Sequence, residues 1–210
     1  MIDFYTWSTP NGRKVSIMLE ECKLDYNLIP INIIKDEQFE EKFLNISPNN
    51  KIPAIYDHET NISMMESGSI LLYLSEKTGV FFPKNDSDRW KRDEWLMFQM
   101  ASLGPMLGQV HHFIKFNAGK SVYAEERYYN EAMRIYGVLD KRLGESEFVA
   151  GKDYGIVDIS IWPWISRYEW QNIDLNKFSN ILRWYKEIAS REAVIKGYDV
   201  PNTGAEIPIP

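Results

Sequence analysis

The chain has 210 residues, 44% hydrophobic and 26% charged, which is enough to bury a core in one large domain or two small ones. This composition excludes disorder as the overall state. The net charge of -6 and the lack of a stripe of Lys and Arg argue against nucleic acid as a partner.

The first 80 residues alternate short apolar runs with amphipathic stretches, a pattern typical of an α/β domain. Turn clusters rich in Ser, Pro, Asn and Gly separate these segments. Ser67 suits a helix N-cap and Gly79 a helix end. In chain order we predict a strand at 2–5, a helix from Asn11 or Gly12 to Cys22, a strand at 28–34, a short helix at 38–44, strands at 52–56 and 62–65, and a helix from Ser67 to Gly79.

The pattern changes after residue 80, and no further strand is predicted. Long helical patterns cover 90–103 and 125–143, an unusually apolar one covers 156–170, and a last helix covers 182–189. We therefore predict an α/β domain at 1–80, a linker at 81–88, an all-helical domain at 89–196, and an irregular, proline-bearing tail at 197–210.

Cys22 is the only cysteine, which excludes an intramolecular disulfide and a C-x-x-C redox pair. The first residues, M-I-D-F-Y, lack the basic flank and apolar stretch of a secretory signal. Every apolar run is much shorter than the roughly 20 residues that a membrane helix needs. We therefore expect a cytoplasmic protein with no membrane association.

Three segments carry a family resemblance that covers nearly the whole chain. Residues 49–55 read N-N-K-I-P-A-I, residues 66–70 read E-S-G-S-I, and residues 151–158 read G-K-D-Y-G-I-V-D. Together they resemble the cis-proline segment, the glutathione motif and the helical-domain motif of the glutathione transferase superfamily. One departure is Gly155, where the family usually has a capping Ser or Thr, although Asp158 follows three residues later.

Further segments resemble the bacterial nu class of this superfamily, the glutathione-dependent disulfide-bond reductases. They are Ser8–Gly12, Ile46–Pro48, Gly104–Gln109, His111–Phe113 and Ile161–Trp164. The resemblance implies a thioredoxin-like N-terminal domain followed by a helical-bundle C-terminal domain. It also implies a homodimer that binds glutathione, as two thiol molecules or as the disulfide, without a metal.

The glutathione motif places Glu66 and Ser67 at the start of a helix. The resemblance implies that Ser67 and the helix N–H groups hold the γ-glutamyl carboxylate, while Glu66 pairs with the ligand ammonium. A solvent-facing capped helix would by itself explain Ser67. The resemblance likewise implies a cis Pro53 and a backbone bond from Ile52 to the cysteinyl part of the ligand. An ordinary trans proline at an edge strand is the alternative.

Three more polar residues are candidates for ligand binding by resemblance. Lys51, by charge, and Gln38, by hydrogen bonding, could reach the glycyl carboxylate, although solvent exposure alone would explain both. Arg127 matches an arginine that reaches glutathione from the helical domain, within or across subunits. An i,i+4 surface partner is the competing explanation for Arg127.

The reaction chemistry is expected between Thr9 and Asn11. Glutathione reacts as its thiolate, which hydrogen-bond donors and the positive end of a helix stabilise. Thr9 offers a hydroxyl and Asn11 an amide and backbone N–H groups at the start of the first helix, with Asn11 slightly favoured. A turn that merely enters the helix would explain the same residues.

Several tempting residues are given structural roles instead. Tyr5 is expected on the first strand, and Cys22 is expected to be a small hydrophobe at a helix end. His111 and His112 diverge by about 100° on a helix and have no third ligand nearby, so we predict no metal site. The Trp162–Trp164 cluster is expected in the core.

The leading hypothesis is a glutathione-dependent disulfide-bond reductase, in which bound glutathione supplies the reacting thiol to a small disulfide or, weakly, to a peroxide substrate. Two alternatives stay open. One is a conventional transferase that conjugates glutathione to electrophiles, and the other is a non-catalytic glutathione-binding regulatory module.

Overall fold

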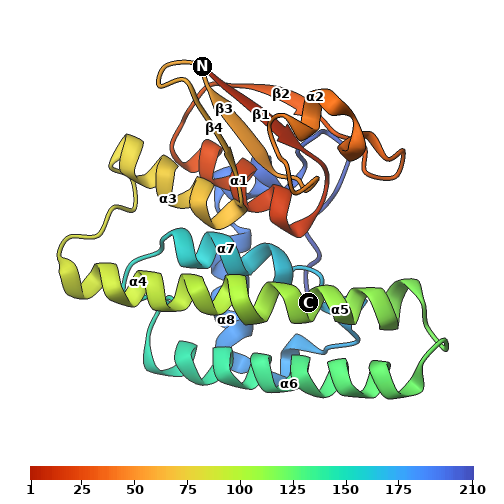
Figure 1. Ribbon diagram of the computed structural model, residues 1–210. Helices are drawn as coiled ribbons and strands as arrows, with labels where there is room; N and C mark the ends of the chain where they lie inside the picture. The colour runs from red at the N-terminus through yellow and green to blue at the C-terminus, as the bar shows by residue number, and fades with distance from the viewer. The chain divides into compact units, whose positions relative to one another are not determined.

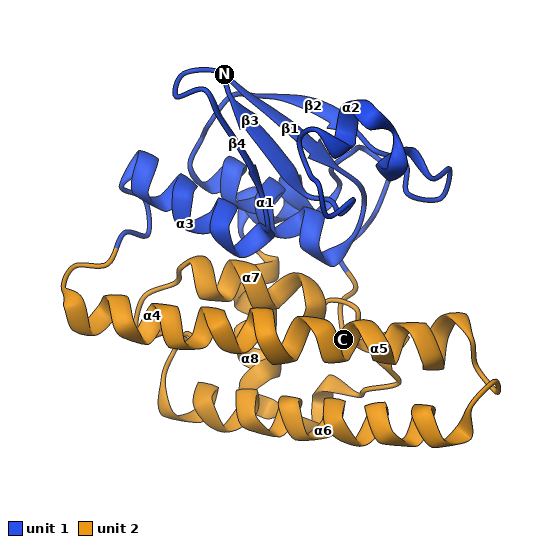
Figure 2. Ribbon diagram, viewed as in Figure 1, with its two compact units in different colours: residues 1–82, 191–207 blue, residues 83–190, 208–210 orange.

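The computed structural model describes all 210 residues, and the chain divides into two compact units (Figures 1 and 2). Unit 1 comprises residues 1–82 and 191–207, and unit 2 comprises residues 83–190 and 208–210. The sequence-based boundaries differ at the C-terminus, because they assigned 191–196 to the helical domain and 197–207 to a tail. None of the helices combines enough length and apolarity to cross a membrane.

Unit 1 is built on a four-stranded sheet in the order β2-β1-β3-β4. The strands are β1 (Ile2–Thr6), β2 (Tyr26–Pro30), β3 (Ala54–Asp57) and β4 (Ile62–Met65). β1 pairs with β2 in parallel, which requires the crossover that α1 (Pro10–Glu21) supplies, and β3 and β4 are antiparallel. This βαβ–ββα arrangement confirms the predicted thioredoxin-like domain.

Helices cover both faces of the sheet. Figure 1 shows α1 and α3 (Ser67–Thr78) together on one face. On the other face, Phe43 of α2 (Glu41–Leu44) packs with Ala54 and Tyr5. The central strands β1 and β3 carry the buried residues of the sheet, whereas β2 and β4 have only half-buried or exposed ones.

Three predicted elements of unit 1 are corrected. The second strand begins at Tyr26 and ends at Pro30, earlier than predicted. The helix predicted at 38–44 is a 3₁₀ turn at Glu37–Phe39 followed by α2, because Glu40 is extended. Ser67, predicted as an N-cap, is instead the first residue of α3, and Glu66 takes the cap position. The helix end predicted at Gly79 is confirmed, with the left-handed φ of 73° that favours glycine there.

A short C-terminal helix completes unit 1. α9 (Glu192–Tyr198) packs along α1, and the Arg13 guanidinium lies 3.6 Å from the centre of the Tyr198 ring. The Arg13 Nε donates to the Tyr198 carbonyl at 2.9 Å, and Ser16 Oγ donates to the Gly197 carbonyl at 2.6 Å. A Cβ at Gly197 would lie 2.7 Å from backbone atoms of Ile17, so only glycine permits this approach.

Unit 2 is all helical, as predicted. Its first helical stretch runs from Asp86 to Phe116 and comprises α4 (Asp86–Phe98), a π segment at Gln99–Leu103, α5 (Gly104–Val110) and a second π segment at His111–Phe116. α6 (Val122–Glu145), α7 (Ile156–Ile165) and α8 (Ser179–Ala189) follow. The linker, predicted at 81–88, is therefore shorter and ends before Asp86. Asn85 caps α4, because its side-chain oxygen accepts from the Asp88 N–H at 2.9 Å. The helix predicted at 156–170 ends at Ile165.

Asp158 anchors the buried helix α7. Every residue of α7 is buried, and the Asp158 carboxylate accepts from the Gly155 and Val149 N–H groups at 3.0 Å each. It also accepts from the Trp184 Nε1 at 2.8 Å. Gly155 has no side chain to cap the helix, and the Asp158 side chain bonds back to the Gly155 N–H at this end. Burial raises the pKa of Asp158 to about 6 despite these donors.

Candidate functional site

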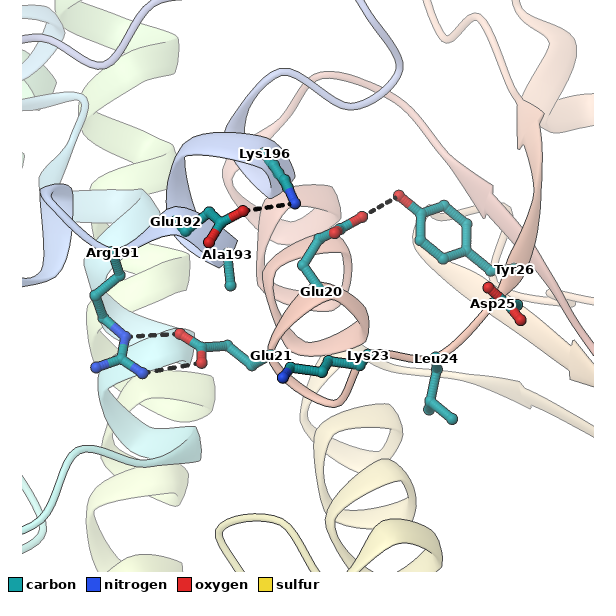
Figure 3. Close-up of a pocket in the computed structure, with 10 residues that line it drawn as sticks. All are labelled: Glu20, Glu21, Lys23, Leu24, Asp25, Tyr26, Arg191, Glu192, Ala193 and Lys196. Carbon is teal, nitrogen blue, oxygen red and sulfur yellow. Dashed lines mark hydrogen bonds and ion pairs between the residues drawn. The ribbon is translucent and has the colours of Figure 1, made fainter.

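The larger hollow of unit 1, of about 860 Å³, lies where α1 ends and α9 begins, and its lining residues are shown in Figure 3. The charged groups there are largely paired with one another. Arg191 bonds both oxygens of Glu21 at 2.7 and 2.9 Å, and Lys196 lies 2.9 Å from Glu192. None of the predicted site residues lines this hollow.

A smaller cavity, of about 150 Å³, lies at the starts of α1 and α3 beside the loop that enters β3. Its lining includes five of the eight predicted site residues. The lining residues are Asn11, Ser47, Asn49, Lys51, Ile52, Pro53, Met65, Glu66 and Ser67. The cavity therefore brings together residues that lie up to 56 positions apart in the chain.

The start of α1 presents hydrogen-bond donors to this region. Thr9 is the N-cap, and its Oγ1 accepts from the Gly12 N–H at 3.1 Å. Because a hydroxyl can accept and donate at once, the Thr9 hydroxyl proton is left to donate elsewhere. Asn11, two residues later, lines the cavity directly. A Cβ at Gly12 would lie 2.4 Å from the Trp7 carbonyl oxygen, so this tight entry into the helix requires glycine.

The loop before β3 has the cis Ile52–Pro53 bond that the resemblance implied. The buried Ser47 hydroxyl donates to the Lys51 carbonyl at 2.8 Å and holds the loop in place. The Lys51 side chain is exposed at the cavity edge. The loop thus sets Ile52 against the cavity.

The start of α3 forms the opposite wall. Glu66 has a φ of 72°, a conformation that residues other than glycine adopt rarely. Its side chain makes no capping bond to the 12-residue helix α3. Ser67 is 6% exposed and lines the cavity. The N–H groups and the positive end of the dipole at a helix start attract an anion such as a carboxylate.

Lys14 is a residue that the sequence analysis missed. It is 1% exposed, and its Nζ lies 3.3 Å from the Ser67 Oγ. Burial lowers the pKa of Lys14 to about 7, against the opposing charge of Glu66. The sequence does carry a sign that Lys14 is buried. It lies four residues before Met18 and therefore on the same apolar face of α1.

Three predicted site residues do not line the cavity. Thr9 adjoins it only through its place at the start of α1. The Gln38 carboxamide Nε2 lies 3.4 Å from the Asp36 Oδ1, outside the lining. Arg127 is an exposed residue of α6 in unit 2. The roles assigned to these three residues stay predictions.

The residues given structural roles lie apart from the cavity lining. Tyr5 packs on Phe43 with ring centres 6.1 Å apart, and the Cys22 Sγ lies 3.5 Å from the Thr78 Oγ1. His111 is buried against Trp164, and burial lowers its pKa to about 4. The structure holds no group of three or more His, Cys, Asp or Glu side chains that could bind a metal ion.

Comparisons with known proteins cover both units. Residues 4–80 match the N-terminal domain model of glutathione S-transferase, and residues 103–192 match the C-terminal domain model. The disulfide-bond oxidoreductase YfcG of Escherichia coli is 47% identical over 198 residues, which cover 92% of each chain. The disulfide-bond oxidoreductase YghU of the same organism is 38% identical over 222 residues, 98% of this chain and 77% of its own.

Solved structures give the same picture. A glutathione transferase from Pseudomonas putida, with one glutathione disulfide bound per subunit, aligns with a TM-score of 0.90 and 38% identity, covering 96% of this chain and 92% of its own. A glutathione transferase family member from Pseudomonas fluorescens pf-5, with two glutathione bound, aligns with a TM-score of 0.87 and 40% identity, covering 94% and 92%.

Proposed function

Because the chain belongs to the glutathione S-transferase family, we propose that this glutathione-dependent enzyme reduces disulfides with bound glutathione as the thiol donor. One observation carries the proposal. Cys22, the only cysteine, does not line the cavity where the starts of α1 and α3 meet the cis-proline loop. The reacting sulfur therefore comes from a bound molecule, and relatives at 47% and 38% identity are named disulfide-bond oxidoreductases.

The cavity walls support a specific placement of glutathione. The α3 N–H groups and the Ser67 hydroxyl hold the γ-glutamyl carboxylate, while the Glu66 carboxylate pairs with the ammonium group. The Ile52 backbone bonds the cysteinyl part as a neighbouring strand would. The glycyl carboxylate lies toward Lys51 and Gln38. Arg127 reaches the ligand from the helical domain, within the subunit or across a homodimer.

This placement sets the glutathione sulfur at the start of α1. There the Thr9 hydroxyl, the Asn11 amide and the backbone N–H groups donate to the thiolate and lower the pKa of the thiol. The thiolate attacks one sulfur of the substrate disulfide, forms a mixed disulfide and releases a thiolate, which takes up the proton that the glutathione thiol lost. A second glutathione thiolate attacks the mixed disulfide, so glutathione disulfide and the second substrate thiol leave.

The same activated thiolate would reduce organic hydroperoxides slowly. The segments that resemble the nu class support this subclass, a homodimer and a cytoplasmic location. The solved relatives that hold two glutathione molecules or one glutathione disulfide support a site in this chain that accommodates both forms.

Parallel assays at equal glutathione concentration test the function. We expect kcat/KM for a model disulfide to exceed that for a chlorinated nitroarene by about a hundredfold or more, since the site stabilises a thiolate for exchange. A dominant conjugation rate would instead identify a conventional transferase. Glutathione that binds without turnover in either assay would favour a non-catalytic glutathione-binding module. No heat on titration of glutathione into the protein would contradict the proposed function.

Removal of the only cysteine tests the source of the sulfur. We expect Cys22→Ser to keep disulfide reductase activity within about twofold, because burial raises the pKa of the Cys22 thiol and keeps it protonated. The variant should unfold at a temperature close to that of the wild type, since the Sγ makes only a 3.5 Å contact with Thr78. A large loss of activity in a folded Cys22→Ser protein would contradict the mechanism.

A further inference from the structure

Lys14 places an amine inside the wall of the cavity. It lies on α1, where residues 12–19 are all buried, and its own side chain is 1% exposed. An amine at such a position is expensive to bury unless it is paired, and a methionine would fill similar space without that penalty. The position of the amine therefore suggests a role beyond packing.

The contact with Ser67 indicates what that role is. The Lys14 Nζ lies 3.3 Å from the Ser67 Oγ, and an ammonium group can only donate hydrogen bonds. The Ser67 oxygen therefore accepts from Lys14. Because Ser67 lines the cavity, this contact links the buried amine to the wall against which the γ-glutamyl carboxylate is placed.

We propose that Lys14 is a positioning residue, which fixes the place of the Ser67 side chain in the cavity wall and supplies positive charge behind the carboxylate of the γ-glutamyl end. This inference rests on the proposed function. Lys14 does not touch the ligand in this arrangement, but acts through Ser67 and through its charge at the start of α3.

The charges around Lys14 make the effect depend on pH. Glu66, at the start of α3, is the charged group that acts on Lys14, and it favours the ammonium form. α9 packs along the same stretch of α1 and is bonded there by the neighbouring cation Arg13 and by Ser16. A carboxylate that binds at the α3 start adds a second negative charge, so it raises the pKa of Lys14 from about 7. Ligand binding should therefore draw a proton into the protein just above neutral pH.

Calorimetric titration of S-methylglutathione tests this inference, because that probe has no thiol to titrate. Between pH 7 and 8.5, in pairs of buffers with different ionisation enthalpies, the wild-type protein should take up about half a proton per ligand bound. Lys14→Met should take up clearly fewer protons, because only the ligand's own α-amino group beside Glu66 is left to gain them. It should also bind the probe about three- to tenfold more weakly at pH 6.5. The difference in affinity should shrink toward pH 9, where Lys14 is neutral in the wild type.

Lys23→Met is the matched control, since Lys23 is exposed just beyond the end of the same helix. It should keep the wild-type affinity and proton uptake. Equal proton uptake in Lys14→Met and wild type would overturn the inference while leaving the proposed function intact. The wild-type titration needs no variant to fold, and binding without buffer-dependent heat there would also overturn it. Failure of the probe to bind the wild type would instead contradict the proposed function.

Discussion

Asp158→Ala is expected to lower the free energy of unfolding by about 3–5 kcal/mol, the largest stability effect of any substitution proposed for this chain. The fully buried carboxylate accepts from Gly155 N, Val149 N and Trp184 Nε1. Alanine would leave the buried Val149 and Trp184 donors without this acceptor, at about 1–3 kcal/mol each, and would also remove the acceptor of the half-buried Gly155 N–H. It would also leave the start of α7 without a side-chain cap.

Urea titration followed by circular dichroism measures this loss, and Asp158→Asn is its control. Asparagine keeps one acceptor oxygen for Val149 and Trp184 but turns an NH₂ group toward the Gly155 N–H. Its loss should therefore be smaller, about 1–2 kcal/mol. If Asp158→Ala unfolded at the same midpoint urea concentration as the wild type, the three hydrogen bonds to the Asp158 carboxylate would not be formed in solution.

The pH dependence of the free energy of unfolding is a second test of the role of Asp158. The folded pKa of Asp158, about 6, lies above its ordinary value of 3.8, so the folded state binds the extra proton between these pH values. Its contribution to stability is therefore complete below pH 3.8 and is lost as pH rises through 6. Asp158→Asn, which cannot titrate, should lack this slope.

Thr9→Ala is expected to lower kcat/KM for a model disulfide by about 10- to 100-fold at neutral pH, because it removes a donor to the glutathione thiolate. The Thr9 Oγ1 already accepts from Gly12, so its proton is the part available to the sulfur. Without that donor the pKa of the bound thiol rises. The pH–rate profile should then shift to higher pH, and activity should partly recover in alkaline buffer.

Two variants separate catalysis from helix capping at Thr9. Thr9→Ser keeps both the cap and the donor, so it should retain near wild-type rates. Thr9→Ala also removes an N-cap, which costs about 1 kcal/mol of stability. If Thr9→Ala lost only that stability and kept the wild-type pH–rate profile, Thr9 would be a cap alone. Asn11→Ala, measured alongside, would then be expected to shift the pH–rate profile to higher pH.

The elements that were predicted well are those whose signals are local. The strand at 62–65 and the helix that ends at Gly79 depend on short-range alternation and on a glycine in the left-handed conformation. The cavity residues Ile52, Glu66 and Ser67 were also predicted, because their contiguous motifs resemble those of the glutathione transferase superfamily. The residues alone left a capped helix and an ordinary trans proline as equal explanations.

The elements that were missed depend on tertiary packing. α5 contains Gly104, Pro105 and Gly108, and α9 contains Gly197, residues with low helix propensity. In α9 the glycine is needed because a side chain would collide with the backbone of α1. Lys14 was missed for a related reason, since lysine is rarely buried and only the folded helix pair α1 and α3 shows that it is.

The return of residues 191–207 to unit 1 sets the timing of its assembly during synthesis. The ribosome makes residues 1–82 first, but α9 emerges only after the whole of residues 83–190 has been translated, a delay on the order of ten seconds at typical elongation rates. Until then the α1 surface that Gly197 and Tyr198 cover stays open to water. Synthesis of unit 1, which contains the cavity, thus begins first and is completed last. A nascent chain that stops at residue 190 would lack α9 on the surface of α1.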